Sequence, residues 1–167
     1  MSDAASDHAI TIHTGRLFRY RGADALDISR KGGHPLGVLF APSWKLLMPF
    51  KERAWDRERR WKRELTNPDE RDRAALLLAI ENEAVQEWSQ YVEKFTEEMK
   101  VSYREHRSAW HAALHLGPEV TVCCFCEDAA RCHRSLVASM FLAAGPKNNA
   151  TVTLGGERPQ PNRKIKS

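Results

Sequence analysis

A short strand, loop and helix pattern most constrains the fold of this chain. Residues 120–125 read Val-Thr-Val-Cys-Cys-Phe, an apolar and β-branched run without polar alternation. Such a run is typical of a strand that is buried on both faces of a parallel sheet. A polar loop follows at 126–131, and apolar residues then recur at helical spacing up to Gly145. The pattern therefore predicts a strand–loop–helix unit of an α/β protein.

The rest of the chain fits one small domain of the same class. Its 167 residues are close to the usual length of a single domain. Further strands are expected at residues 9–12, 36–40 and 150–154. We predict a single α/β domain over residues 9–157, with a small, mainly parallel, Rossmann-like sheet that is flanked by helices. Residues 1–8 are expected to form a flexible leader and residues 158–167 a disordered basic tail.

The middle of the chain is predicted to be a long helical segment. Asn67 and Pro68 are typical of an N-cap and of a first helical position. Apolar side chains then recur three or four residues apart, as expected for the buried face of a helix. They are Val85, Trp88, Val92, Phe95 and Met99.

Composition and cysteine placement restrict the class of protein. Hydrophobic residues make up 42% of the chain and charged residues 29%, which excludes disorder of the whole chain. No apolar run is long enough to span a membrane, and the first residues lack the layout of a signal peptide. All four cysteines lie between Cys123 and Cys132. Such clustering indicates metal binding, thiol chemistry or a buried strand rather than a disulfide framework. We predict a cytoplasmic protein with no membrane partner.

The first interpretation of the strand–loop–helix unit is an anion-binding site. Ligands of open α/β sheets bind beyond the carboxyl ends of the strands, and the amides at a helix start attract anions. Arg131 and Arg134, with Ser135 beside them, could hold a phosphate. The same field is expected to lower the pKa of the Cys132 thiol. His133 is a candidate for proton transfer near neutral pH.

Two other interpretations stay open for the same residues. Cys124, Cys126, Cys132 and His133 are suitable ligands for tetrahedral zinc, so zinc is the one candidate cofactor. The spacing C-x-C-x5-C-H, however, differs from the usual pairs of C-x2-C, and adjacent cysteine and histidine ligands are awkward to bring together. The last interpretation is that the cysteines pack as small hydrophobic residues, which is simplest for Cys123.

Several motifs resemble the family known as domain of unknown function 488, whose hallmark is a cysteine, a short acidic loop and Cys-His-Arg. The matching motifs are Cys124-Phe125-Cys126 and Cys132-His133-Arg134-Ser135, followed by an apolar helix. Agreement in order extends to Asp27-Ile28-Ser29, Phe40-Ala41-Pro42-Ser43-Trp44, Tyr91, Met99, Ser102-Tyr103, Trp110, Gly145 and Gly156-Glu157. The resemblance covers residues 10–157 and implies a compact cytosolic α/β domain, common in bacteria and their phages. It carries no established activity.

We expect these motifs to meet in one site of a nucleotide- or nucleic-acid-directed enzyme, a hydrolase or a transferase. The candidate catalytic residues are Asp27, Cys132, His133 and Glu157. The candidate ligand-binding residues are Ser29, Ser43, Trp44, Arg131, Arg134 and Ser135. The alternative is a non-catalytic nucleic-acid-binding module, in which the cysteines hold a structural zinc or simply pack.

A basic helical insertion at residues 51–83 is longer than the family pattern leads us to expect. Between Lys51 and Arg63, seven basic and three acidic residues leave a net charge of +4. The candidate nucleic-acid contacts are Arg53, Arg57, Arg60 and Arg63, because arginine side chains bind phosphates. A solvated helix of mixed charge would have the same composition, so both interpretations stay open. The sequence does not indicate an oligomeric state.

Overall fold

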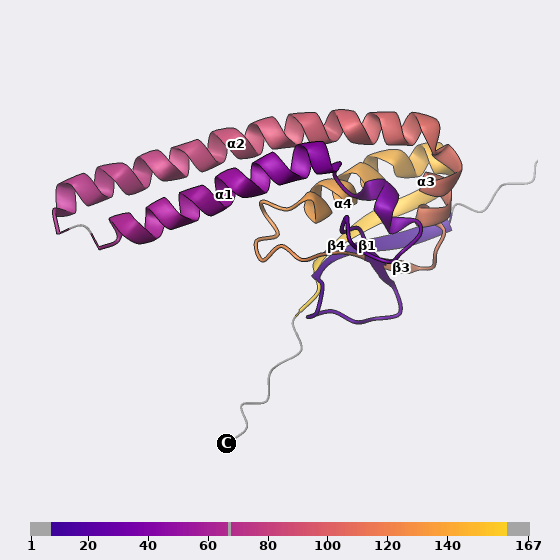
Figure 1. The fold of residues 1–167 in the computed structure, drawn as a ribbon. Helices are drawn as coiled ribbons and strands as arrows, with labels where there is room; N and C mark the ends of the chain where they lie inside the picture. The colour runs from indigo at the N-terminus through magenta and orange to yellow at the C-terminus, as the bar shows by residue number, and fades with distance from the viewer. Residues whose placement is uncertain (1–7, 67, 160–167) are drawn as a thin grey trace, which may run out of the picture. The chain divides into compact units, whose positions relative to one another are not determined.

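The computed structural model describes residues 8–66 and 68–159, which fall into two compact units. The first unit holds the described residues before Pro42 and after Glu98, and it contains a sheet of four parallel strands (Figure 1). The second unit is the helical segment Pro42–Glu98. The predicted α/β fold with a small parallel sheet is confirmed.

The strand order is β2-β3-β1-β4, which places the predicted buried run at the centre of the sheet. The strands are β1 (His8–Arg16), β2 (Ala25–Asp27), β3 (Glu119–Cys124) and β4 (Ala150–Glu157). Every residue of β3 except the first is buried, as expected for a strand covered on both faces. Because all four strands run in the same direction, their carboxyl ends meet at one edge of the sheet.

Helices complete the core of the first unit. Helix α4 (His133–Ala144) contacts β1, β3 and β4. Helix α3 (Arg107–Leu114) contributes Trp110, whose ring meets Phe40 and Phe141 edge to face at centroid distances of 4.9 and 5.6 Å. Edge-to-face packing of buried aromatic rings is favourable beyond the area that it buries.

Some predicted element boundaries are wrong. The apolar segment 36–40 contains a short 3-10 helix, Gly37–Phe40, and no strand. The Asp69 carboxylate accepts hydrogen bonds from the amides of Arg71 and Asp72 and so caps helix α2 (Glu70–Glu105), which begins two residues after Pro68. Asn67, the predicted cap, lies outside the described residues.

The predicted ends of the domain also need correction at two residues. His8, which was assigned to the leader, is the first residue of β1. Arg158, which was assigned to the tail, donates its backbone amide to the Thr14 carbonyl and its guanidinium to Asp24 and Glu119. The other residues of the predicted leader, 1–7, and most of the predicted tail, 160–167, lie outside the described residues.

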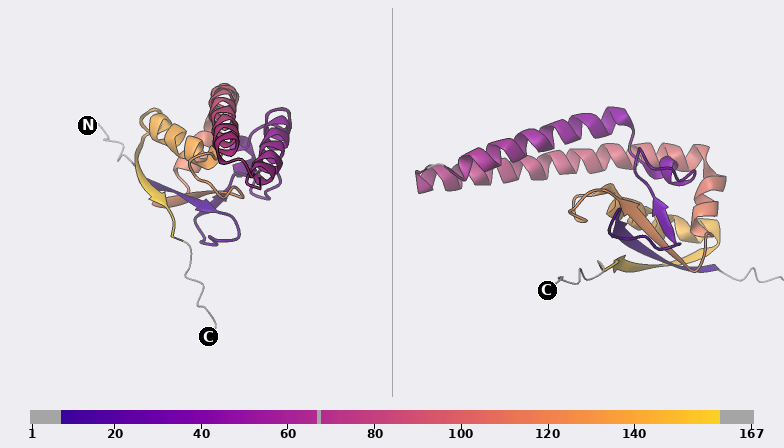
Figure 2. Two further views of the ribbon diagram at one scale, coloured as in Figure 1. Left: turned by 90° about the vertical axis from the view of Figure 1, so that its left-hand side faces the viewer. Right: turned by 60° about the horizontal axis from the view of Figure 1, so that its bottom comes forward.

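In the second unit, helix α1 (Trp44–Glu64) and residues 70–98 of α2 lie side by side and antiparallel (Figures 1 and 2). The Phe50 ring packs against Trp88 and Tyr91, with centroid distances of 6.1 and 4.5 Å. Arg53 and the buried Arg57 both form ion pairs with Glu87. The two helices are therefore joined by aromatic and by ionic contacts.

None of the helices in the described part of the chain has both the length and the apolar character needed to cross a membrane.

The Glu87 carboxylate is expected to be important for the helical unit, because its loss removes a negative charge that pairs with the buried Arg57. We predict that Glu87→Gln lowers the free energy of unfolding by about 3 kcal/mol. The matched control is Glu83→Gln, which removes a partner of Arg60 that is more exposed than Glu87 and should cost less than about 1 kcal/mol. Urea unfolding followed by helical circular dichroism measures both. Equal effects of the two substitutions would contradict the prediction.

Candidate metal centre

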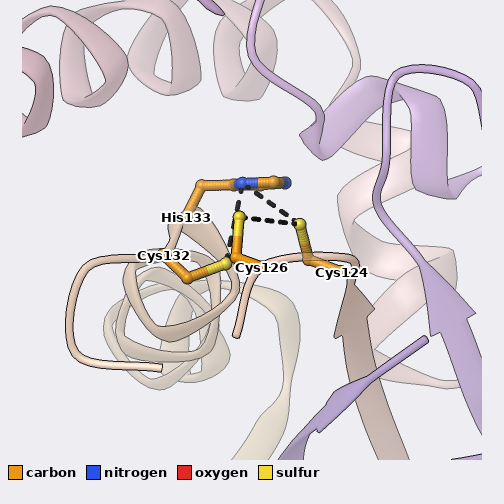
Figure 3. Close-up of side chains that lie close together, drawn as sticks. All are labelled: Cys124, Cys126, Cys132 and His133. Atoms are coloured by element: carbon orange, nitrogen blue, oxygen red, sulfur yellow. Dashed lines mark hydrogen bonds between the residues drawn. The ribbon is translucent and has the colours of Figure 1, made fainter. Parts of the chain in front are cut away.

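Four potential metal ligands converge where β3 leads into α4. Cys124 ends β3, Cys126 lies in the following loop, Cys132 is the N-cap of α4 and His133 is its first residue. Their four ligand atoms, three Sγ and the Nδ1 of His133, all lie within 4.8 Å of one another. Figure 3 shows the four side chains directed toward a common centre.

Three of the distances between the ligand atoms are close to those expected around a tetrahedral metal ion. The Cys124 Sγ lies 3.7 Å from the Cys126 Sγ and 3.7 Å from the His133 Nδ1, and the Cys132 Sγ lies 3.9 Å from the same nitrogen. Zinc binds thiolates and imidazoles at about 2.3 and 2.0 Å, which puts neighbouring ligand atoms of a tetrahedral site about 3.5–3.8 Å apart. The residues present fit such an ion.

The helix start explains how adjacent cysteine and histidine ligands converge. Cys132 has an extended backbone, with φ −132° and ψ 142°, whereas His133 is already helical. The change of backbone conformation between them turns both side chains to the same side. The Cys132 Sγ also accepts a hydrogen bond from the Arg134 amide at 3.5 Å, so the thiol takes the place of the usual capping oxygen.

A hydrogen bond on the far side of the imidazole orients His133 for metal binding. The His133 Nε2 lies 3.1 Å from the carbonyl oxygen of Ile28, the residue after β2. A carbonyl only accepts, so Nε2 carries the proton and Nδ1 presents its lone pair to the sulfur atoms. Metal-binding histidines are typically fixed by such a bond from the second ring nitrogen.

The pKa values of three of the cysteine thiols are raised, which favours their protonated form when no metal is bound. The hydrogen bond with Cys126, together with burial, raises the pKa of Cys124 to about 11. Hydrogen bonds with Cys124 and Cys126, followed by burial, also raise the pKa of Cys132. The expected lowering of the Cys132 pKa by the helix start is therefore wrong, because its sulfur neighbours and its burial outweigh the helix. Burial raises the pKa of Cys123 to about 12.

Arg134 is directed into the protein and holds protein groups rather than facing solvent. Only 1% of its side chain is exposed. Its Nη1 donates to the Cys126 carbonyl at 2.7 Å, and its Nη2 lies 3.5 Å from the Glu127 carbonyl. Its Nε and Nη2 donate to the two carboxylate oxygens of Glu157 at 3.3 and 3.1 Å. The Arg134 guanidinium, which we predicted to hold a phosphate, thus forms its hydrogen bonds with groups of the protein.

Other predicted site residues lie along the same edge of the sheet. The Asp27 carboxylate accepts a hydrogen bond from the Ser29 amide at 2.8 Å, and the Ser29 hydroxyl is buried without a hydrogen-bond partner among the described residues. The Ser135 hydroxyl donates to the Ala129 carbonyl at 2.7 Å. Arg131 is half-buried in the loop before α4. The structure therefore brings the Asp27, Cys132 and Glu157 segments to one edge.

Ser43 and Trp44 belong to the second unit. Ser43 caps α1, since its hydroxyl oxygen accepts a hydrogen bond from the Leu46 amide at 3.2 Å, and it also bonds the Glu98 carboxylate. Trp44 is 46% exposed. The capping geometry is a sufficient structural reason for a serine at position 43.

The four arginines predicted to contact nucleic acid all have carboxylate neighbours. Arg53 and Arg57 pair with Glu87, and Arg60 pairs with Glu83. The remaining candidate, Arg63, has a side chain that is 72% exposed and pairs with Glu64.

Two contributions were missed by the sequence reasoning. The Ile28 carbonyl fixes the His133 ring. Every residue has a backbone carbonyl, so this role cannot be inferred from the residue type. The Thr14 hydroxyl donates to the Glu157 carboxylate, because the two residues are paired in the β1–β4 register. The available hint was the alternation of apolar and polar residues over 10–13, which indicates a strand that leads to Thr14.

Comparison with known proteins gives one match. The model of the DUF488-N3a family, described as the active DUF488-N3 subclade, matches residues 73–145, which include all four candidate ligands. The resemblance to the family of domain of unknown function 488 is therefore confirmed over somewhat less than half of the chain. No curated protein and no solved structure matches.

The buried Arg134 should matter more for stability than an arginine on the surface. We predict that Arg134→Met lowers the free energy of unfolding by about 3 kcal/mol, because two carbonyls lose a hydrogen bond and the Glu157 carboxylate loses its positively charged partner. Arg16→Met is the matched control: it removes an ion pair with the exposed Glu127 and should cost less than about 1 kcal/mol. Denaturant unfolding of both variants checks this, and similar midpoints would show that Arg134 is not a central contact.

Proposed function

We propose that Cys124, Cys126, Cys132 and His133 bind one zinc ion and that the chain is a zinc-stabilised α/β domain. The supporting observation is the convergence of four suitable ligand atoms within 4.8 Å, with the His133 ring already fixed by the Ile28 carbonyl. Thiols that only pack have no need to face a common point, whereas here three sulfur atoms and the His133 Nδ1 face one another. A metal ion bound between them would replace the thiol protons.

The donor set favours zinc over other biological metals. Three thiolates and one imidazole form a soft set with tetrahedral geometry, whereas magnesium and calcium require oxygen ligands. Zinc has no geometric preference of its own and accepts the tetrahedral arrangement that this loop provides.

The proposed role of the ion is structural. Catalytic zinc sites usually have three protein ligands and one open position, whereas this cluster offers four. Three of the four residues are buried, and only Cys126 is partly exposed. A bound ion would tie the end of β3 to the start of α4, and the His133 ring would extend this connection to the residue after β2. Thiolate ligands persist in a reducing compartment, which supports a cytoplasmic location.

An enzymatic role is proposed for groups outside the metal cluster. The matching subclade is described as active, and this supports a reaction in the present chain as well. Four protein ligands leave the ion no place for substrate, so a nucleotide-directed reaction would use other residues at the same sheet edge. Nucleic-acid binding by the basic segment has weaker support, because its arginines are paired with carboxylates of the same unit.

Metal analysis tests the zinc proposal directly. Protein purified without added metal should contain about one zinc ion per chain, as measured by plasma mass spectrometry. Cys126→Ser removes the most exposed ligand and should lose most of the zinc. Cys123→Ala is the matched control, because Cys123 is an adjacent buried cysteine outside the cluster. This variant should keep its zinc.

Chelation provides the second measurement. Because the ion binds only the folded site, its removal by a chelator should lower the melting temperature of the wild-type protein and of Cys123→Ala, and zinc should restore it. A chelator should have little effect on Cys126→Ser. Metal-free wild-type protein whose melting temperature does not respond to zinc would contradict the proposal. Stoichiometric iron or copper would contradict the choice of metal.

A further inference from the structure

A pocket of about 360 Å³ lies where β1 and β4 end against the first half of α4. Its lining includes Thr14, Ala130, Ser135, Ser139, Leu154 and Glu157. Of these residues, the sequence pointed to Ser135 and Glu157 only. The carboxyl edge of a parallel sheet is the usual place for a ligand in an α/β protein, so the chemistry of this pocket indicates what kind of molecule it could hold.

The hydroxyl groups of the pocket wall all donate their protons to the protein. The Thr14 hydroxyl donates to the Glu157 carboxylate. The Ser135 hydroxyl donates to the Ala129 carbonyl at 2.7 Å, and the Ser139 hydroxyl donates to the Ser135 carbonyl at 3.1 Å. A hydroxyl oxygen whose proton is engaged offers only lone pairs to a ligand. The three hydroxyls are therefore hydrogen-bond acceptors toward the pocket.

The Glu157 carboxylate is a further acceptor, and it is held in place. Arg134 donates to both of its oxygens, and the Thr14 hydroxyl donates to Oε2. The side chain is nevertheless 39% exposed. Its Oε1 accepts only the bond from Arg134 among the described residues, which leaves a lone pair for a ligand. The adjacent guanidinium balances the negative charge of the carboxylate.

The pocket is thus rich in acceptors and nearly balanced in charge. Among the lining side chains in the described part of the chain, no donor remains unengaged, and the Ala130 amide is also taken up, by the Asp128 carboxylate. A phosphate or a carboxylate would find only acceptors among these side chains. A cation would find its attraction to Glu157 offset by Arg134. The ligand that fits is neutral and carries several hydroxyl donors.

The rest of the wall is apolar and suits the carbon face of such a molecule. Ile12, Ala138 and Leu154 line the pocket beside the acceptors. A sugar ring combines an apolar face with hydroxyl donors along its rim. We propose that this pocket binds the vicinal hydroxyls of a neutral sugar, either as a free sugar or as the ribose of a nucleoside. The proposal is independent of zinc binding, because Arg134 and Thr14 hold Glu157 without the metal cluster.

Calorimetric titration of the full chain tests this assignment with three probes: D-ribose, adenosine and 2′,3′-dideoxyadenosine. We expect ribose, adenosine or both to bind, and the dideoxynucleoside to bind at least ten-fold more weakly than adenosine. Binding of ribose alone would identify a free-sugar site, and binding of adenosine alone a nucleoside site. Either result supports the proposal. Equal affinities for adenosine and its dideoxy analogue would overturn it.

Variants show whether the binding occurs in this pocket. Ala130→Phe fills the pocket from an exposed loop position and should abolish binding. Ala143→Phe introduces the same side chain at an exposed position of α4 outside the pocket lining and should leave binding unchanged. Ser139→Ala removes one acceptor and should weaken binding several-fold. Unaltered binding by Ala130→Phe would overturn the assignment, as would failure of the wild-type protein to bind ribose or adenosine.

Zinc content is measured on the same samples. If Ala130→Phe keeps its metal but no longer binds ribose or adenosine, the loss of binding comes from the filled pocket and not from a loss of metal. Wild-type protein that contains its full zinc and binds neither ribose nor adenosine would contradict the sugar-binding proposal and leave the zinc proposal standing.

Discussion

The Arg134 guanidinium is a full positive charge inside the first unit, and only 1% of its side chain reaches solvent. A charge at such a position is tolerated only when hydrogen bonds and an opposite charge compensate for the lost water. The compensating groups are the Cys126 and Glu127 carbonyls and the Glu157 carboxylate. They come from the loop after β3 and from the end of β4, so α4 holds both segments through one side chain. Because Cys126 belongs to the ligand cluster and Glu157 to the pocket wall, Arg134 connects the two.

The sequence singled out the four candidate ligands but could not choose among their roles. A helix that starts with Cys132, His133 and Arg134 is equally compatible with an anion site, a metal site and simple packing. The decision depends on backbone conformation, which is extended at one ligand and helical at the next, and on the Ile28 carbonyl behind the imidazole. It also depends on Glu157, which lies 23 positions beyond Arg134 and converts an expected phosphate clamp into an internal one.

Secondary structure was predicted correctly where the burial of a strand is visible in its residue types. Apolar and polar residues do not alternate along the run 120–125 because both faces of β3 are covered, and β3 lies at its predicted place. The apolar segment 36–40 has a similar composition, yet it crosses the end of β2 so closely that a Cβ at Gly37 would lie 1.8 Å from the Asp27 carbonyl oxygen. Tertiary contact, not local preference, decides such a case. The charge of residues 51–63 was visible, but its glutamate partners in α2 were not.

The ends and the middle of the loop between Cys126 and Cys132 have different roles. Its two ends carry the ligands and the carbonyls that Arg134 requires, whereas Ala129 and Ala130 between them form part of the pocket wall. Closing so short a loop costs little entropy once its ends are fixed. The side chains in the middle of the loop are therefore expected to contribute little to the stability of the fold. In the course of evolution, ligand preference in this architecture can change through one or two substitutions while the scaffold that carries them stays the same.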